Sequence, residues 1–82
     1  MLAIDKQGNE YSIQPIKDCE ENADGAYCEV YPYDKDGESA NDYTDFFCIH
    51  KEDCPNEGVW DEYGGLTAEA ETFATNYIKS NF

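Results

Sequence analysis

Alternating apolar and polar residues predict a β-hairpin in the first part of the chain. Residues 2–5 and 10–15 alternate with the two-residue period of a strand, and Lys-Gln-Gly-Asn at 6–9 is typical of a turn. Pro15 has no N–H to donate to a neighbouring strand, so we expect the second strand to end at this residue or to lie at a sheet edge. The polar residues 18–25 then indicate a loop.

A second hairpin is predicted between residues 26 and 50. Residues 26–33 place Cys28 and Val30 on one face and three tyrosines with Glu29 on the other, and Asp36-Gly37 is a strong hairpin signal. The return strand covers about residues 43–50. Its one face carries Tyr43, Asp45, Phe47 and Ile49, and its other face carries Thr44, Phe46, Cys48 and His50. Because both faces contain aromatic residues, we expect this strand to be central in the sheet.

The last segment has the periodicity of an amphipathic helix. Its apolar stripe consists of Ala70, Phe73, Ala74, Tyr77 and Ile78. Thr67 is suited to the N-cap, and Lys79 matches the negative end of the helix dipole. Residues 51–65 indicate a structured loop or a short edge strand around Val59-Trp60. The expected fold is one α+β domain over residues 1–82, a small antiparallel sheet of roughly three to five strands with one C-terminal helix packed on one face.

The distribution of charge along the chain is informative about function. The chain has 19 acidic residues, 5 lysines and no arginine, for a formal net charge of −14, of which −12 lies on residues 19–66. Charge this concentrated repels itself and weakens the compact state. It attracts basic partners and repels nucleic acid and anionic membranes. Disordered acidic chains are poor in aromatic residues, whereas this chain is 15% aromatic, so we expect a folded module with a cationic target.

The acidic residues have a spacing that can imitate a nucleic-acid backbone. Carboxylates two residues apart on a strand stand about 6.6 Å apart, a spacing at which they can meet successive phosphate-binding residues. Asp34, Asp36 and Glu38 have this spacing, and a solvated surface kept for solubility is the alternative. The predicted partner-binding residues are Glu20, Glu21, Asp24, Glu29, Asp34, Asp36, Glu38, Asp42, Asp45, Trp60, Asp61 and Glu62.

Trp60 fits two roles. With Asp61 and Glu62 beside it and Gly64-Gly65 following, it suits an acid-rimmed interface anchor for a basic partner. Alternatively, it closes the small core beneath the helix, which the scarcity of large aliphatic residues favours.

A small, acidic, tyrosine-rich domain of this kind resembles the phage-encoded inhibitors of bacterial defence systems, such as anti-CRISPR and anti-restriction proteins. The resemblance covers the composition of the whole chain. It implies a DNA mimic that docks on a basic, nucleic-acid-binding component of a CRISPR-Cas or restriction system, in the host cytoplasm, and blocks nucleic-acid access. Some members of these families inhibit their targets in other ways, by blocking a different surface or by causing dimerisation.

The four cysteines allow three interpretations: disulfides, buried thiols, or zinc ligands with His50. Against disulfides, a cytosolic chain keeps its thiols reduced. Against zinc, the sequence contains no Cys-x-x-Cys pair. Residues 34–45 only partly match a calcium loop. We therefore predict no metal and no cofactor. The cysteines are Cys19, Cys28, Cys48 and Cys54.

The first residues lack the basic start and apolar stretch of a signal peptide, so we expect a cytosolic protein. The chain has one histidine, and neither a nucleophile motif nor a phosphate-binding glycine loop, so we predict that it is not an enzyme. The alternatives to an inhibitory binding module are a secreted, disulfide-stapled interaction module and a metal-binding regulator.

Overall fold

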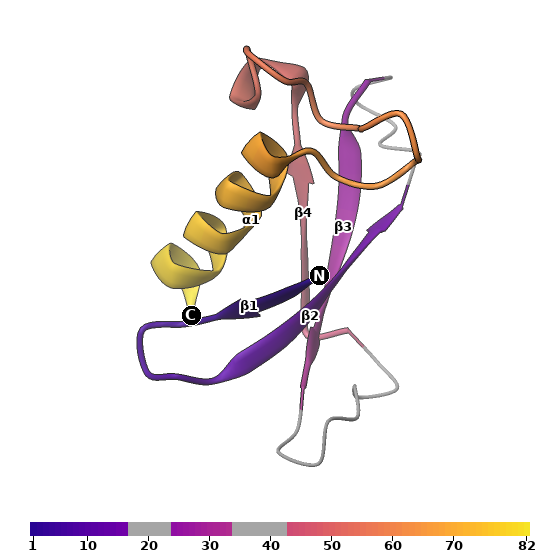
Figure 1. Cartoon of the computed structure of the whole chain (residues 1–82). Coiled ribbons are helices and arrows are strands. Elements are labelled where there is room, and N and C mark those ends of the chain that lie inside the picture. The colour runs from indigo at the N-terminus through magenta and orange to yellow at the C-terminus, as the bar shows by residue number, and fades with distance from the viewer. Residues whose placement is uncertain (17–23, 34–42) are drawn as a thin grey trace.

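The computed structural model describes residues 1–16, 24–33 and 43–82 and shows an antiparallel sheet with a helix against it (Figure 1). The strands lie in the order β1-β2-β3-β4, so each hydrogen-bonds to its neighbour in sequence. The elements are β1 Leu2–Ile4, β2 Glu10–Ile16, β3 Ala26–Pro32, β4 Asp45–Ile49, the short 3-10 helix η1 Lys51–Asp53, and α1 Ala68–Asn81. The protein therefore has the α+β fold that the sequence predicted.

Asp5 fixes the turn of the first hairpin. One carboxylate oxygen accepts hydrogen bonds from the backbone N–H groups of Gln7 at 2.8 Å and Asn9 at 2.9 Å, and the other accepts from the Asn9 side chain and the Tyr11 hydroxyl. Gly8 has a φ of +88°, a backbone conformation that glycine adopts without strain. Burial alone would raise the pKa of Asp5, but these hydrogen bonds favour the charged form and lower it.

Pro15 lies inside β2, so of the two predicted alternatives the end of the strand at this residue is wrong, whereas an edge position holds locally within the described sheet. β2 continues to Ile16 and pairs with both β1 and β3. Ile13 exchanges backbone hydrogen bonds with Met1. In an antiparallel strand the backbone groups of every second residue point to the same side, so those of Pro15 point to the same side as those of Ile13, at a position past Met1. No described strand lies on that side of Pro15. The missing N–H of Pro15 therefore costs no backbone hydrogen bond within the described sheet.

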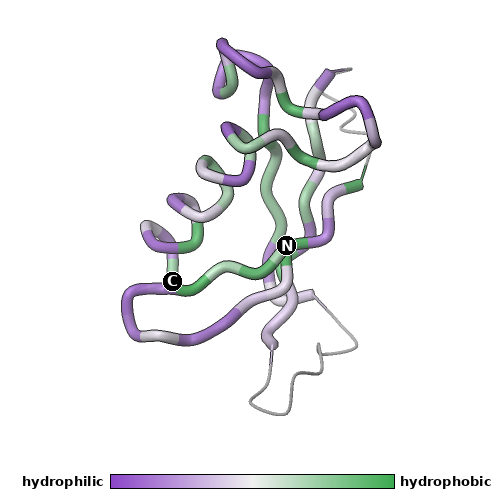
Figure 2. Tube along the Cα trace, in the orientation of Figure 1, coloured by the Kyte–Doolittle hydropathy of each residue, from purple (hydrophilic) through white to green (hydrophobic). Residues whose placement is uncertain are grey.

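α1 follows Thr67, the predicted N-cap, whose hydroxyl oxygen accepts a hydrogen bond from the Ala70 N–H at 3.1 Å. Hydrophilic and hydrophobic positions alternate along the helix (Figure 2). Its fully buried residues are Ala70, Ala74 and Ile78. The buried strand residues of the same core are Ala3, Ile13, Ala26, Cys28, Val30, Phe47 and Ile49. In the described part of the chain, no helix is both long and apolar enough to cross a membrane.

β4 is an edge strand of the described sheet, so the prediction of a central strand is wrong. It pairs with β3 alone. Phe47 and Ile49 are buried on the helix side, whereas Phe46 is 53% exposed on the opposite face. Tyr43 was predicted to share the face of Asp45, but it precedes the strand and its ring contacts Phe46. Aromatic residues on both faces here reflect one covered face and one exposed face.

Residues 51–65 form the structured loop that was expected; it contains η1, and its Trp60 makes a β-bridge with Leu66. Glu69, in the first turn of α1, attaches this loop to the helix. Its carboxylate accepts hydrogen bonds from the backbone N–H groups of Glu57 at 2.8 Å and Asn56 at 3.0 Å. These bonds, the one from Glu57 first, outweigh partial burial and lower the pKa of Glu69.

Candidate functional site

α1 covers one face of the sheet, and no described element covers the other, which we call the open face (Figure 1). Antiparallel register sets its side chains in rows across the strands. Among the described residues, most exposed large hydrophobic side chains lie on or beside this face, and Tyr63 in the loop is the exception. Those on or beside the open face are Leu2, Ile4, Ile16, Tyr43 and Phe46. An exposed apolar face on so charged a chain is the strongest candidate for a binding surface.

Four rings form a continuous aromatic cluster on the open face: Tyr27, Tyr31, Tyr43 and Phe46. Tyr27 stacks on Phe46 with ring centroids 5.3 Å apart. Tyr43 stands edge-on to Tyr31 at 6.2 Å and to Phe46 at 6.3 Å. Aromatic pairs favour these geometries, so the rings support one another without a helix above them. Tyr43 is 46% exposed, and a partner can therefore reach both its ring and that of Phe46.

Glu29 lies inside the aromatic cluster. On β3 it stands between Tyr27 and Tyr31, and the register sets it opposite Phe46 on β4. The Tyr31 hydroxyl donates a hydrogen bond to the Glu29 carboxylate at 2.9 Å. Burial is the main cause that raises the pKa of the Tyr27 hydroxyl, and the neighbouring Tyr43 and Glu29 raise it further. The open face therefore presents a carboxylate framed by aromatic rings.

The charged residues of the described strands are all acidic: Glu10, Glu29 and Asp45. Glu10 pairs with Ile4 and so shares the open face with Glu29. Asp45 lies on the helix side, where it accepts a hydrogen bond from the Tyr77 hydroxyl at 3.0 Å. The described strands thus carry aromatic rings and carboxylates but no lysine, a combination that suits a partner that is both apolar and cationic.

Trp60 has the placement of a core residue. It is half-buried, packs against the core, and donates its indole Nε1–H to the carbonyl oxygen of Gly25 at 3.1 Å. This bond ties the loop to the start of β3. Of the two roles that the sequence left open, the contacts favour the structural one.

The other described acids of the predicted site have separate surroundings. The Asp61 carboxylate accepts hydrogen bonds from the backbone N–H groups of Tyr63 at 2.8 Å and Gly65 at 2.9 Å, so it holds a turn. Asp24, before β3, and Glu62, in the loop, are exposed. Six predicted residues lie outside the described chain: Glu20, Glu21, Asp34, Asp36, Glu38 and Asp42. The carboxylate row predicted over residues 34–38 is among them.

The described cysteines lie in three different environments. Cys28 is buried on the helix side of β3, and Cys48 is half-buried on the open face of β4, so the sheet itself separates this pair. Cys54 is buried in the loop, and burial first, then nearby carboxylates such as Glu69, raise the pKa of its thiol. Cys19 lies outside the described residues, as does most of the calcium-like segment. Within the described ranges, no three His, Cys, Asp or Glu side chains gather to hold a metal.

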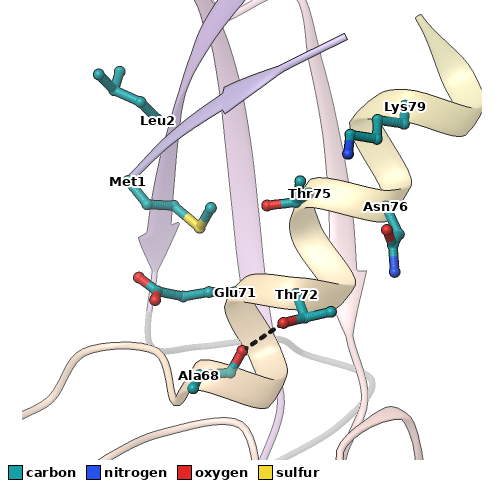
Figure 3. A pocket seen from close by; sticks show the side chains of 8 residues that line it. All are labelled: Met1, Leu2, Ala68, Glu71, Thr72, Thr75, Asn76 and Lys79. Atoms are coloured by element: carbon teal, nitrogen blue, oxygen red, sulfur yellow. Dashed lines mark hydrogen bonds between the residues drawn. The ribbon is translucent and has the colours of Figure 1, made fainter. Parts of the chain in front are cut away.

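A groove of about 530 Å³ lies between the start of β1 and one side of α1 (Figure 3). Met1 reaches toward the helix from one wall. On the other wall, the Thr72 hydroxyl donates a hydrogen bond to the Ala68 carbonyl oxygen at 3.0 Å. The two charged residues of the lining, Glu71 and Lys79, have opposite signs. This groove therefore selects no ligand by charge and is a weaker candidate than the open face.

The sequence analysis missed the aromatic cluster as a site, although its signal was present. Alternation already placed Tyr27 and Tyr31 opposite Cys28 and Val30, and Phe46 opposite Phe47. A single helix can cover only one face of a sheet. Combining these two observations would have identified the exposed rings.

Comparison with known proteins gives a family and no activity. Residues 7–81 match a family described as a domain of unknown function, DUF7773. No curated protein and no solved structure shows significant similarity to the chain. The matched residues include β2, β3, β4 and α1, and with them the whole aromatic cluster. Because the match covers nearly all of the chain, the protein belongs to the DUF7773 family.

Proposed function

We propose that this protein is an inhibitory binding module that docks on a basic, nucleic-acid-binding protein and blocks nucleic-acid access to it. The observation that carries this proposal is the open face, on which exposed rings surround a carboxylate in a chain of net charge −14. Aromatic residues supply contact area at interfaces, and complementary charge selects and steers the partner.

Nucleic-acid-binding proteins are the partner class that best fits this surface. They bind phosphates through clustered lysine and arginine side chains, and these cations can also bind the carboxylates of a protein. A strongly acidic module on such a surface excludes nucleic acid by occupying the same groups. The resemblance to phage-encoded inhibitors points in the same direction and suggests a CRISPR-Cas or restriction component as the target.

We place this action in the host cytoplasm, where those targets work and where thiols stay reduced. Cys28 and Cys48 lie on opposite faces of the sheet, which supports thiols over a bond between them. A thiol count on protein purified without reductant tests this placement. Reactive thiols are expected under denaturing conditions, and their complete absence would favour the secreted, disulfide-stapled alternative.

Competition binding tests the inhibitory function. A partner captured from host lysate is loaded with labelled nucleic acid, and the protein is titrated in at several salt concentrations. We expect mutual exclusion, with an affinity that falls steeply as salt rises. A stable ternary complex of partner, nucleic acid and this protein would overturn exclusion as the mechanism.

Variants locate the surface that competes. Glu29→Gln and Phe46→Ala should weaken competition, whereas the exposed controls Glu71→Gln on α1 and Tyr63→Ala in the loop should not. Equal losses from both pairs would exclude the open face as the docking site. Neutral changes over residues 34–38 test the carboxylate row in the same assay.

A further inference from the structure

We infer that the aromatic cluster binds the guanidinium group of an arginine side chain, with Glu29 as the paired carboxylate. This inference rests on the proposed function, because it names the chemistry of the partner for the same face.

The sheet geometry brings the required groups within reach of one cation. Adjacent strands lie about 4.8 Å apart, and alternate residues of a strand lie about 6.6 Å apart. Glu29 therefore has Tyr27 and Tyr31 on either side along β3 and Phe46 across the strand pair. A guanidinium is attracted to an aromatic ring when it lies within about 6 Å of the ring centroid. A cation paired with Glu29 meets that condition for more than one ring.

The Glu29 carboxylate is prepared to accept a second donor. Its Oε1 already accepts the Tyr31 hydroxyl at 2.9 Å, which restricts the rotation of the side chain before a ligand arrives. An ionised carboxylate has about four acceptor positions, so the bond from Tyr31 leaves capacity for the N–H groups of a guanidinium. The exposed parts of Phe46 and Tyr43 then supply stacking surface beside it.

Two features favour arginine over other occupants. A guanidinium is planar, weakly hydrated, stacks on rings and pairs with carboxylates through two N–H groups, whereas the lysine ammonium is a compact, strongly hydrated charge. A second copy of this chain could not supply the group, because the chain contains no arginine and each copy carries a charge of −14. The open face of a second copy would also bring its own Glu10 and Glu29 against the same acids.

The test compares two short peptides of equal length and equal charge, one carrying arginines and the other lysines in a Gly-Ser background. Affinities are measured by calorimetry on the full chain at physiological ionic strength. Because net charge acts equally on both peptides, their affinity ratio measures the preference for a guanidinium over an ammonium, and the open-face variants assign that preference to the site. We expect the arginine peptide to bind about fivefold more tightly, the scale of a cation–π contact at an exposed site. Glu29→Gln and Phe46→Ala should each remove this preference, and Glu71→Gln and Tyr63→Ala should retain it.

Equal affinities for the two peptides on the unmodified protein would overturn the inference, as would a preference that survives both open-face variants. Circular dichroism checks that each variant folds, and Tyr43→Ala probes the same ring surface if Phe46→Ala does not fold. The peptide ratio involves no nucleic acid. A ternary complex in the competition assay, together with an intact arginine preference, would therefore overturn the proposed exclusion and leave the arginine site standing.

Discussion

The two faces of the sheet use the same strands for different purposes. On β3, Cys28 and Val30 point toward α1 and are fully buried, while Tyr27 and Tyr31 point away and remain partly exposed. The covered face combines small and branched side chains with Phe47, whose ring stacks on that of Tyr77 of α1 with centroids 4.1 Å apart. The open face combines large rings around Glu29. The core and the proposed binding surface therefore lie on opposite sides of one sheet.

This division explains why so acidic a chain can carry exposed rings. Each fully buried branched side chain of the covered face contributes about 1.5–3 kcal/mol to folding. The rings of the open face keep apolar surface that no described element buries. Such surfaces promote self-association, and the repulsion that comes with a net charge of −14 opposes it.

The largest expected effect comes from the covered face. Ile78 is fully buried between α1 and the sheet, so Ile78→Ala should lower the free energy of unfolding by about 2–5 kcal/mol. Urea unfolding followed by circular dichroism measures the loss, and Ser80→Ala on the exposed side of α1 is the control. A loss as small as that of the control would mean that α1 does not close the core.

Thiol labelling compares the two faces directly. Cys48 on the open face should react with iodoacetamide at least about tenfold faster than Cys54, whose buried thiol has a raised pKa and forms the reactive thiolate less readily. Mass spectrometry of digested samples assigns the label to each cysteine. Equal rates would contradict a closed core beneath the loop.

Acid should weaken the hairpin turn at Asp5. The pKa of Asp5 is lower in the folded protein than in the unfolded chain. The contribution of its charge to stability is therefore fully present above the pKa of the unfolded chain, and it is lost as the pH falls through the pKa of the folded protein. Asp5→Asn should therefore be less stable than the unmodified protein at pH 7, and the difference should shrink below about pH 4. Thermal melts across this range measure the difference. A gap that stays constant with pH would mean that the charge of Asp5 is not what holds the turn.

The smallest expected effect on stability comes from the open face. Phe46→Ala removes a ring that is 53% exposed, with its stacked contact to Tyr27 and its edge contact to Tyr43, so the free energy of unfolding should fall by less than about 1 kcal/mol. The same urea experiment compares it with Ile78→Ala. Comparable losses would show that the aromatic cluster is a second core, and the division between the faces would no longer hold.

Local patterns were sufficient to predict the elements. The apolar spacing over residues 70–78 and the hydroxyl of Thr67 predict α1 because helix periodicity and capping depend on near neighbours. The antiparallel pairing of both hairpins is likewise confirmed. The edge position of β4 could not be predicted in this way. Aromatic residues on both faces of the strand suggested that both faces are covered, but which faces are covered depends on the whole chain and cannot be seen in the alternation of one strand.

The candidate site was harder to predict because charge alone does not show how a carboxylate is used. Glu29 was included among the predicted residues, and it lies in the aromatic cluster. Asp45 was included as well, but its hydrogen bond comes from Tyr77, 32 residues further along the chain. Such long-range donors leave no mark on the local sequence.

Trp60 has one more consequence, for spectroscopy. It is the chain's single tryptophan, and its indole is held against the core and the Gly25 carbonyl, whereas the aromatic cluster consists of tyrosine and phenylalanine. Tryptophan emission should therefore report the opening of the loop and core. Tyrosine absorbance should respond to a ligand on the open face. In the folded protein, a change in tyrosine absorbance without a change in tryptophan emission would thus report binding, although Tyr11 and Tyr77 beside the core also respond to unfolding.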